Sequence, residues 1–152
     1  MKKYFMLFIV LIIVIACNKV QIDTPEGFVQ YTKERNYYKG ISSDGIVIKS
    51  HRVEQNSSEK STDINLWSKE MAIVFKSKGY VNEKTEKIQT INGLKGSYTE
   101  YSLFHNGEVY LYAISLFTDD DDLYLVEVGG QKKYFDKRRE AIMKAIKSLQ
   151  VN

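Results

Sequence analysis

The chain offers few side chains for acid–base or nucleophilic catalysis. It has two histidines, His51 and His105, and no Gly-x-Ser-x-Gly pattern of the kind that places a nucleophilic serine on a sharp turn. His105 precedes Asn106-Gly107, so we expect an exposed histidine beside a hairpin turn. His51 lies near the end of an expected strand, which leaves one catalytic hypothesis, in which His51 acts with Glu127. The sequence supplies no other partner for His51, so we expect neither enzymatic activity nor a cofactor.

Four consecutive aspartates, Asp119 to Asp122, are the strongest candidate for binding a hard cation. The spacing of a calcium loop is absent, because Leu123 and Leu125 stand where oxygen ligands are needed and no glycine follows at the bend. The run therefore predicts a solvated turn that keeps a hairpin tip soluble, and no metal site.

Aromatic residues concentrate between residues 98 and 124 and give the better indication of a binding function. They are Tyr98, Tyr101, Phe104, Tyr110, Tyr112, Phe117 and Tyr124. One interpretation is packing across strands and under helices. The other is a groove or open sheet face that recognises a partner, since tyrosine is favoured in such surfaces. Trp67 has the same two interpretations, a helix anchor or an exposed hot spot.

Glu127 is the most informative single charge, because it stands between Val126 and Val128 in an otherwise apolar stretch. It either pairs with a lysine or arginine at a sheet edge or marks a polar pocket. The candidate binding residues are Trp67, Tyr110, Tyr112 and Glu127.

The N-terminal segment carries a different chemistry, centred on the only cysteine, Cys17. Lys2 and Lys3 precede an apolar run, Phe5 to Ala16, of roughly 12 residues, whereas a membrane-spanning helix needs about 20. The tetrapeptide Val14-Ile15-Ala16-Cys17 resembles the lipobox of bacterial lipoproteins. The alternatives are an uncleaved anchor helix and a plain signal peptide with an incidental cysteine.

The lipobox resemblance implies that residues 1–16 are a signal peptide, cleaved before Cys17. The Cys17 sulfur would carry a diacylglyceryl group, with palmitate-like acyl chains that attach the protein to a membrane. The expected location is then the bacterial cell envelope, on the extracytoplasmic side, in the periplasm or at the cell surface.

Composition places further limits on function. The 136 residues left after cleavage suit one domain, and losing Lys2 and Lys3 leaves 20 basic and 19 acidic residues. A nearly neutral surface excludes nucleic acid as an expected partner and argues against a polybasic membrane patch. No second cysteine is available for a disulfide.

The order of the elements follows from periodicity and turn signals. Residues 17–27 contain the only proline and no periodic pattern, which predicts a lipidated N-terminus and tether before one domain at 28–152. Asp63 and Gly79 flank a stretch with helical spacing of apolar residues, and Asn92-Gly93 and Asn106-Gly107 each predict a type I′ turn. The expected strands are 37–41, 45–53, about 80–91, 94–104, 108–117 and 123–128, and the expected helices are 63 to about 78 and about 133–149.

The stretch Val109–Phe117 is apolar or aromatic on both of its alternating faces. A strand with one wet face alternates apolar and polar residues, so this one is expected inside the sheet with a helix over each face. Gly129-Gly130 is expected to end the following strand. The prediction is an α+β fold: an antiparallel sheet of about six strands between two amphipathic helices.

This order of elements behind a lipobox resembles the PsbP-like superfamily. The segments that carry the resemblance are Tyr38-Lys39-Gly40-Ile41, Gly45-Ile46-Val47-Ile48, Ile91-Asn92-Gly93-Leu94-Lys95-Gly96 and Ala145-Ile146-Lys147-Ser148-Leu149. The family's proline-tryptophan element is replaced by Lys49-Ser50-His51-Arg52, so no functional residue carries over. The resemblance implies an accessory, binding or assembly role, because such proteins are mostly not enzymes.

Three functional hypotheses follow. The leading one is a membrane-anchored envelope lipoprotein that binds an envelope protein without catalysis. The second is a small-ligand carrier or sensor with a cavity between sheet and helix, lined by Trp67, Tyr110 and Tyr112. The third is an enzyme that uses His51 and Glu127.

Overall fold

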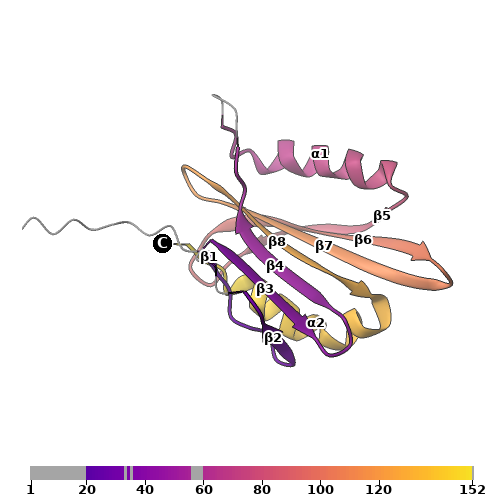
Figure 1. The fold of residues 1–152 in the computed structure, drawn as a ribbon. Helices are drawn as coiled ribbons and strands as arrows, with labels where there is room; N and C mark the ends of the chain where they lie inside the picture. The colour runs from indigo at the N-terminus through magenta and orange to yellow at the C-terminus, as the bar shows by residue number, and fades with distance from the viewer. Residues whose placement is uncertain (1–19, 33, 35, 56–59, 152) are drawn as a thin grey trace, which may run out of the picture.

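The structure is a computed structural model that describes residues 20–32, 34, 36–55 and 60–151. Its main sheet has seven antiparallel strands, in the spatial order β2-β3-β4-β8-β7-β6-β5 (Figure 1). The strands are β2 (Phe28–Gln30), β3 (Tyr37–Ser42), β4 (Val47–Arg52), β5 (Val81–Gln89), β6 (Lys95–His105), β7 (Glu108–Thr118) and β8 (Leu123–Gln131). The helices are α1 (Ile64–Ser77) and α2 (Lys132–Lys147), and β1 (Val20–Gln21) pairs with β9 (Gln150–Val151) in a separate two-stranded sheet.

The expected α+β class is confirmed, with seven strands in the main sheet instead of six. The additional strand is β2, which pairs with β3 through Phe28 opposite Ser42. At three residues β2 is too short to produce a recognisable alternation in the sequence.

The two helices cover opposite faces of the sheet, as expected (Figure 1). On one face α2 buries Phe135, Ile142 and Ile146 completely. On the other face α1 packs Trp67 and Phe75 onto the sheet, yet no residue of α1 is fully buried. α2 is therefore the firmly packed helix, and α1 the lightly packed one.

Strand β7 lies inside the sheet and contacts both helices, as predicted for Val109–Phe117. Its successive residues Leu116 and Phe117 are 2% and 0% exposed, although they point to opposite faces. This double burial explains the absence of polar alternation.

Helix α1 begins and ends where the sequence indicates. The Asp63 carboxylate accepts hydrogen bonds from the backbone N–H groups of Asn65 (2.8 Å) and Leu66 (3.3 Å). Gly79 follows the helix with a φ of 86°, the left-handed conformation that glycine adopts without strain.

The two Asn-Gly turns differ. Asn106 and Gly107 both have positive φ, 50° and 80°, as a type I′ turn requires. In the other turn only Gly93 has positive φ, and its N–H donates to the Thr90 carbonyl (3.0 Å). The type I′ prediction is therefore wrong for this second turn, which is a longer loop closed between Thr90 and Leu94.

Gly129 and Gly130 lie within β8, and the expectation that they end the strand is wrong. They are positions where neighbouring side chains need space. A Cβ on Gly129 would lie 3.0 Å from the Tyr112 ring, and one on Gly130 would lie 2.3 Å from Ile46 Cδ1. The strand tolerates the missing side chains because these neighbours fill the gaps.

The folded domain begins before residue 28, so most of the segment expected as a tether is structured. Val20 and Ile22 are 5% and 3% exposed, and Val20 pairs with Val151. The Asp23 N–H also donates to Ser148 Oγ (2.8 Å). Strand β1 has only two residues, which is too short for a recognisable alternation in the sequence. It forms a strand because it pairs with β9 near the C-terminus. Cys17, the predicted lipidation site, lies outside the described residues.

Candidate functional site

The space between α1 and the sheet is filled by aromatic rings. Phe75 stacks on Tyr101 with ring centroids 4.6 Å apart, and it also contacts Tyr80 and Tyr112 at 5.0 and 5.2 Å. Rings at these separations are in van der Waals and edge contact. The cavity proposed between sheet and helix is thus occupied by side chains of the protein itself.

Trp67 belongs to this packed cluster and is half-buried. Its indole N–H donates to the carbonyl of Ser61 (2.9 Å), which ties the start of α1 to the preceding loop. Tyr110, also half-buried, lies opposite Leu103 on β6 and Gln131 on β8. Neither side chain lines the hollow that lies beside α1 on the sheet.

A shallow hollow of about 220 Å³ lies beside α1, on the part of the sheet that this helix leaves uncovered. Its lining residues are Lys39, Val47, Lys49, Tyr112, Glu127 and Gly129. We call the surface formed by these six residues the open face. Helix α1 packs over β5, β6 and β7 instead, so no helix of the described residues lies above β3, β4 and the end of β8 on this side (Figure 1).

Polar chemistry on the open face centres on Glu127. The Tyr112 hydroxyl donates a hydrogen bond to the Glu127 carboxylate from the neighbouring strand. Burial, and then this hydrogen bond, raise the pKa of the Tyr112 phenol, so the group stays protonated. Glu127 thus lines the hollow, and among the described residues it forms no ion pair.

Two lysines complete the row across the strands, since Lys39 lies opposite Lys49 and Lys49 lies opposite Glu127. The Lys39 ammonium stands 4.7 Å from the centre of the Tyr31 ring, a cation–π distance. Among the described residues, neither lysine forms an ion pair. The hollow is therefore a mixed-charge site that can offer two ammonium groups and one carboxylate to a ligand.

His51 and Glu127 do not form an acid–base pair here. His51 lies opposite Leu125, diagonal to Glu127 on the neighbouring strand, and packs against Tyr37 with ring centroids 6.1 Å apart. Its Nδ1 atom is buried with no hydrogen-bond partner among the described residues. The side chain faces a separate, open hollow of about 500 Å³ that includes Arg52 and Glu54. His105 is exposed beside its turn, as expected.

Two of the four consecutive aspartates have structural partners. Asp119 accepts hydrogen bonds from the Asp122 N–H (2.8 Å) and the Tyr124 hydroxyl (2.6 Å), and Asp122 forms an ion pair with Arg52 (3.2 Å). Partial burial opposes ionisation, but these hydrogen bonds hold the pKa of Asp119 below its ordinary value. Asp120 and Asp121 are exposed, in keeping with a solvated turn. Within the described ranges, no three metal-ligating side chains gather at one point.

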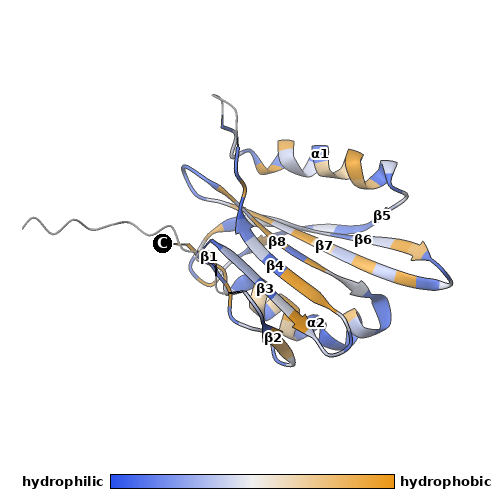
Figure 2. Ribbon diagram, viewed as in Figure 1, coloured by the Kyte–Doolittle hydropathy of each residue, from blue (hydrophilic) through white to orange (hydrophobic). Residues whose placement is uncertain are grey.

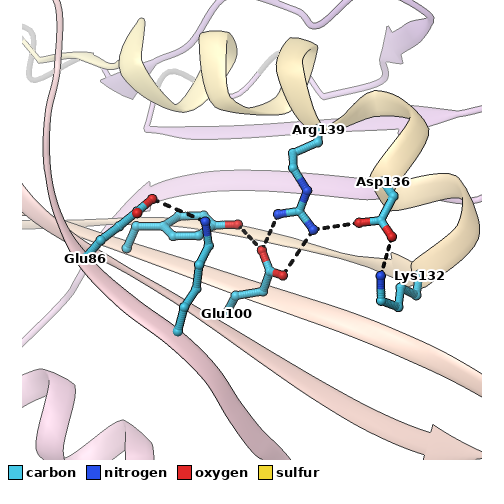
Figure 3. Close-up of polar contacts among 7 residues, drawn as sticks. Glu86, Glu100, Lys132, Asp136 and Arg139 are labelled. Carbon is cyan, nitrogen blue, oxygen red and sulfur yellow. Dashed lines mark hydrogen bonds and ion pairs between the residues drawn. The ribbon is translucent and has the colours of Figure 1, made fainter.

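A partly buried ion-pair network, centred on the buried Glu100, attaches α2 to the sheet (Figure 3). Arg139 binds both oxygens of Glu100, at 2.5 and 3.1 Å, and also reaches Asp136 at 2.6 Å. The Tyr98 hydroxyl donates a further hydrogen bond to Glu100 (2.6 Å). Burial alone would raise the pKa of Glu100, but the hydrogen bonds from Arg139 and Tyr98 outweigh it and lower that pKa. No spacing in the sequence relates β6 to α2, so this network could not be foreseen.

The preceding residue, Arg138, holds the opposite side of α2. Its Nε donates to both oxygens of Asp44, at 2.9 and 3.0 Å, in the turn between β3 and β4. The Arg138 guanidinium, together with the Ser42 hydroxyl, lowers the pKa of Asp44. The helix is thus fixed at both flanks, and these charged groups serve the fold.

Apolar side chains are exposed at the end of the sheet where β6 turns into β7. Val81, Phe104 and Val109 are 59%, 72% and 38% exposed, and Phe104 lies directly opposite Val109. Val81 is opposite Ser102, so it is a diagonal neighbour of Phe104. Figure 2 shows the hydrophobic colour at this end of β6. We call these three residues the apolar tip.

Comparisons with known proteins give similarity in structure only. No family model matches the chain, and no curated protein matches its sequence. The cyanobacterial PsbP protein (CyanoP) of Synechocystis superimposes with a TM-score of 0.58 at 13% identity, over 91% of this chain and 96% of that one. LpqN of Mycobacterium tuberculosis, described as involved in cell envelope biogenesis, gives a TM-score of 0.59 at 8% identity over 88% and 83%.

A Bacteroides thetaiotaomicron protein matches with a TM-score of 0.57 at 12% identity, over 90% of this chain but only 49% of its own length. None of the helices in the described part of the chain is long and apolar enough to cross a membrane. The order of strands and helices, together with these superpositions, establishes that the domain has a PsbP-like α+β fold.

Proposed function

We propose that the protein is a lipid-anchored accessory protein of the bacterial cell envelope, which binds another envelope protein without catalysing a reaction. The lipobox around Cys17 supports the anchor, and the similarity to an envelope-biogenesis protein supports the location. A lipid on Cys17 would confine the domain to the membrane surface, which raises its effective concentration toward partners there.

One observation carries the choice of a protein as the partner. The interior between α1 and the sheet is filled by the rings around Phe75, whereas Val81 and Phe104 expose apolar surface to solvent. A carrier of small apolar ligands needs the reverse, an enclosed cavity of several hundred Å³. Adjacent exposed apolar side chains are typical of a surface that another protein covers.

The test is site-specific photocrosslinking of the full-length, Cys17-containing protein in cells. A photoreactive phenylalanine analogue replaces Phe104 in one variant and Lys87, an exposed residue of β5 away from the apolar tip, in the control. We expect one abundant envelope protein to be captured from position 104 and not from position 87. Identical captures from both positions would contradict the proposal.

A substitution then tests whether the captured protein binds the apolar tip or only lies near it. Phe104→Ser removes an apolar ring that is 72% exposed, so folding should be unaffected while capture from a neighbouring position is lost. Lys87→Ser is the matched control, and it should change neither folding nor capture of the partner. Loss of capture after changing Trp67 or Tyr110, without unfolding, would place the partner nearer to α1.

A second candidate function is the binding of a small polar ligand on the open face. It is favoured by Lys39, Lys49 and Glu127 around a hollow of about 220 Å³. That volume is below the roughly 300–1,000 Å³ of most small-molecule sites, which ranks this function second. Lys49→Ala should abolish retention of such a ligand in purified protein, as measured by mass spectrometry, and leave the crosslinking at position 104 unchanged.

A further inference from the structure

The β1–β9 end of the domain is separated from the predicted lipidation site, Cys17, by a very short stretch of chain. Val20 is the first described residue, it is 5% exposed, and it pairs with Val151. Only Asn18 and Lys19 separate it from Cys17. Three residue steps of fully extended chain span at most about 11 Å, so a lipid on Cys17 would hold β1 within that distance of the membrane surface.

The surface around this end suits a layer of lipid headgroups. Ile91, in the turn between β5 and β6, is 75% exposed, and its N–H donates to the Lys147 carbonyl (2.8 Å) at the end of α2. This hydrogen bond places the turn beside β9, which follows α2 directly. Lys95 and Lys147 are exposed, and among the described residues neither forms an ion pair. These two lysines are no polybasic patch, but each can be attracted to anionic headgroups while the Ile91 side chain enters the headgroup layer.

The acidic turn at residues 119–122 is also at this end of the sheet and has to be weighed against the lysines. In Figure 1 it extends toward the α1 side, whereas β1 and α2 lie on the other side of the sheet. Anionic lipid repels the exposed Asp120 and Asp121 and attracts Lys147. The domain should therefore tilt so that the α2 side of this end meets the headgroups.

The apolar tip lies at the opposite end of the sheet. Strand β6 runs from Lys95, beside the Ile91 turn, to His105, beside the tip. Nine residue steps from Lys95 to Phe104, at about 3.4 Å each, separate the two ends by about 31 Å. Figure 1 shows β1, the first described strand, at one end of the molecule and the β6–β7 hairpin at the other.

We infer that the short link from Cys17 holds the end of the domain marked by Ile91 against the headgroups of an anionic bilayer, and directs Phe104 away from the membrane. This inference rests on the lipid anchor of the proposed function. It adds an orientation, which leaves the apolar tip accessible to a partner about 30 Å from the lipid surface.

The experiment uses the mature protein, lipidated on Cys17, in vesicles of phosphatidylethanolamine and phosphatidylglycerol. The variants Ile91→Cys and Phe104→Cys are each labelled with an environment-sensitive fluorophore, and lipids that carry a nitroxide near the headgroup act as quenchers. The lipid occupies Cys17, so only the introduced thiol reacts. We expect strong quenching and a blue-shifted emission at position 91, and neither at position 104. Equal quenching at both positions, or quenching at 104 alone, would overturn the inference.

A linker variant tests the role of the short connection. Insertion of about 20 Gly/Ser residues between Lys19 and Val20 gives a root-mean-square reach of about 25 Å without changing the domain. The protein should remain on the vesicles, but quenching at position 91 should fall to the level at position 104. Undiminished quenching at 91 would show that the link does not set the orientation. Failure of the proposed anchor gives a different result from failure of the orientation. Without an anchor, the Cys17-containing protein would not bind the vesicles at all.

Discussion

Arg139 of α2 and Glu100 of β6 form a bidentate ion pair in which Glu100 is almost completely buried and Arg139 is one-third exposed. Two parallel hydrogen bonds between a guanidinium and a carboxylate fix direction as well as distance. Together with the Arg138–Asp44 pair on the other flank, this contact determines how α2 lies on the sheet.

Arg139→Ala should destabilise the domain by about 2 kcal/mol. Removing one partner of a buried ion pair leaves an uncompensated charge and costs about 3–5 kcal/mol, and solvent access to Arg139 reduces that figure. Urea unfolding followed by circular dichroism measures the change. Lys132→Ala, at a half-exposed residue of the same network, is the control and should cost about 0.5 kcal/mol or less. Equal losses in the two variants would contradict a dominant Arg139–Glu100 pair.

The same pair predicts how stability depends on pH. The pKa of Glu100 is lowered in the folded state, so the unfolded chain binds more protons in acid. The stabilisation is complete above the ordinary value of 4.5 and is lost as the pH falls through the lower, folded pKa. Urea midpoints measured from about pH 7 to about pH 3 should fall less steeply for Glu100→Gln than for the wild type. Parallel curves would assign the acid sensitivity to Asp44, Asp119 and Asp136, whose pKa values are also lowered.

Gly130→Ala should destabilise the domain by about 1–3 kcal/mol through overpacking. The new methyl group would lie 2.3 Å from Ile46 Cδ1, and Ile46 is completely buried. Ile46→Val removes that Cδ1 atom, so the double variant should recover part of the loss despite the smaller core residue. Thermal unfolding of the wild type, the two single variants and the double variant gives the free energies for a double-mutant cycle. Additive losses would mean that the two positions do not compete for space.

The elements with long, regular patterns could be predicted from the sequence, whereas the contacts between distant elements could not. Asp63 and Gly79 mark the ends of α1 because helix caps are local. Strand β4 pairs with β8, far along the chain, and no pattern in either strand specifies that partner. Lys39 and Lys49 reach the open face only through this strand order, so they were not recognised as neighbours of Glu127.

Of the four candidate binding residues, Tyr112 and Glu127 meet on the open face, and Trp67 and Tyr110 lie elsewhere on the α1 side. Glu127 was recognisable because a charge interrupts an apolar strand. The packing of Trp67 was not, because an aromatic residue at helical spacing suits both a core and a surface site. Their roles in binding remain predictions for the crosslinking experiment.

Cys17→Ser should release the protein from membranes. The predicted anchor is a lipid on the Cys17 sulfur, and a serine oxygen cannot form that thioether. Metabolic labelling with a fatty-acid analogue, followed by separation of membrane and soluble fractions, measures both consequences. If the variant stays as firmly membrane-bound as the wild type, residues 1–16 are an ordinary anchor and not a lipoprotein signal peptide.

Ile22→Ala tests whether the N-terminal segment belongs to the fold. A residue in a tether can be truncated without effect, but Ile22 is 3% exposed and packs in the core on the α2 side. Its truncation should cost about 2–4 kcal/mol, the usual cost of a cavity in a packed core. Val29→Ala is the matched control, because Val29 is 68% exposed and should lose less than about 0.5 kcal/mol. Chemical unfolding of the chain from Asn18 onward gives both values. If Ile22→Ala costs no more stability than Val29→Ala, residues 20–27 act as a tether and not as part of the fold. The link from Cys17 to the domain would then be long, which would contradict the proposed orientation at the membrane.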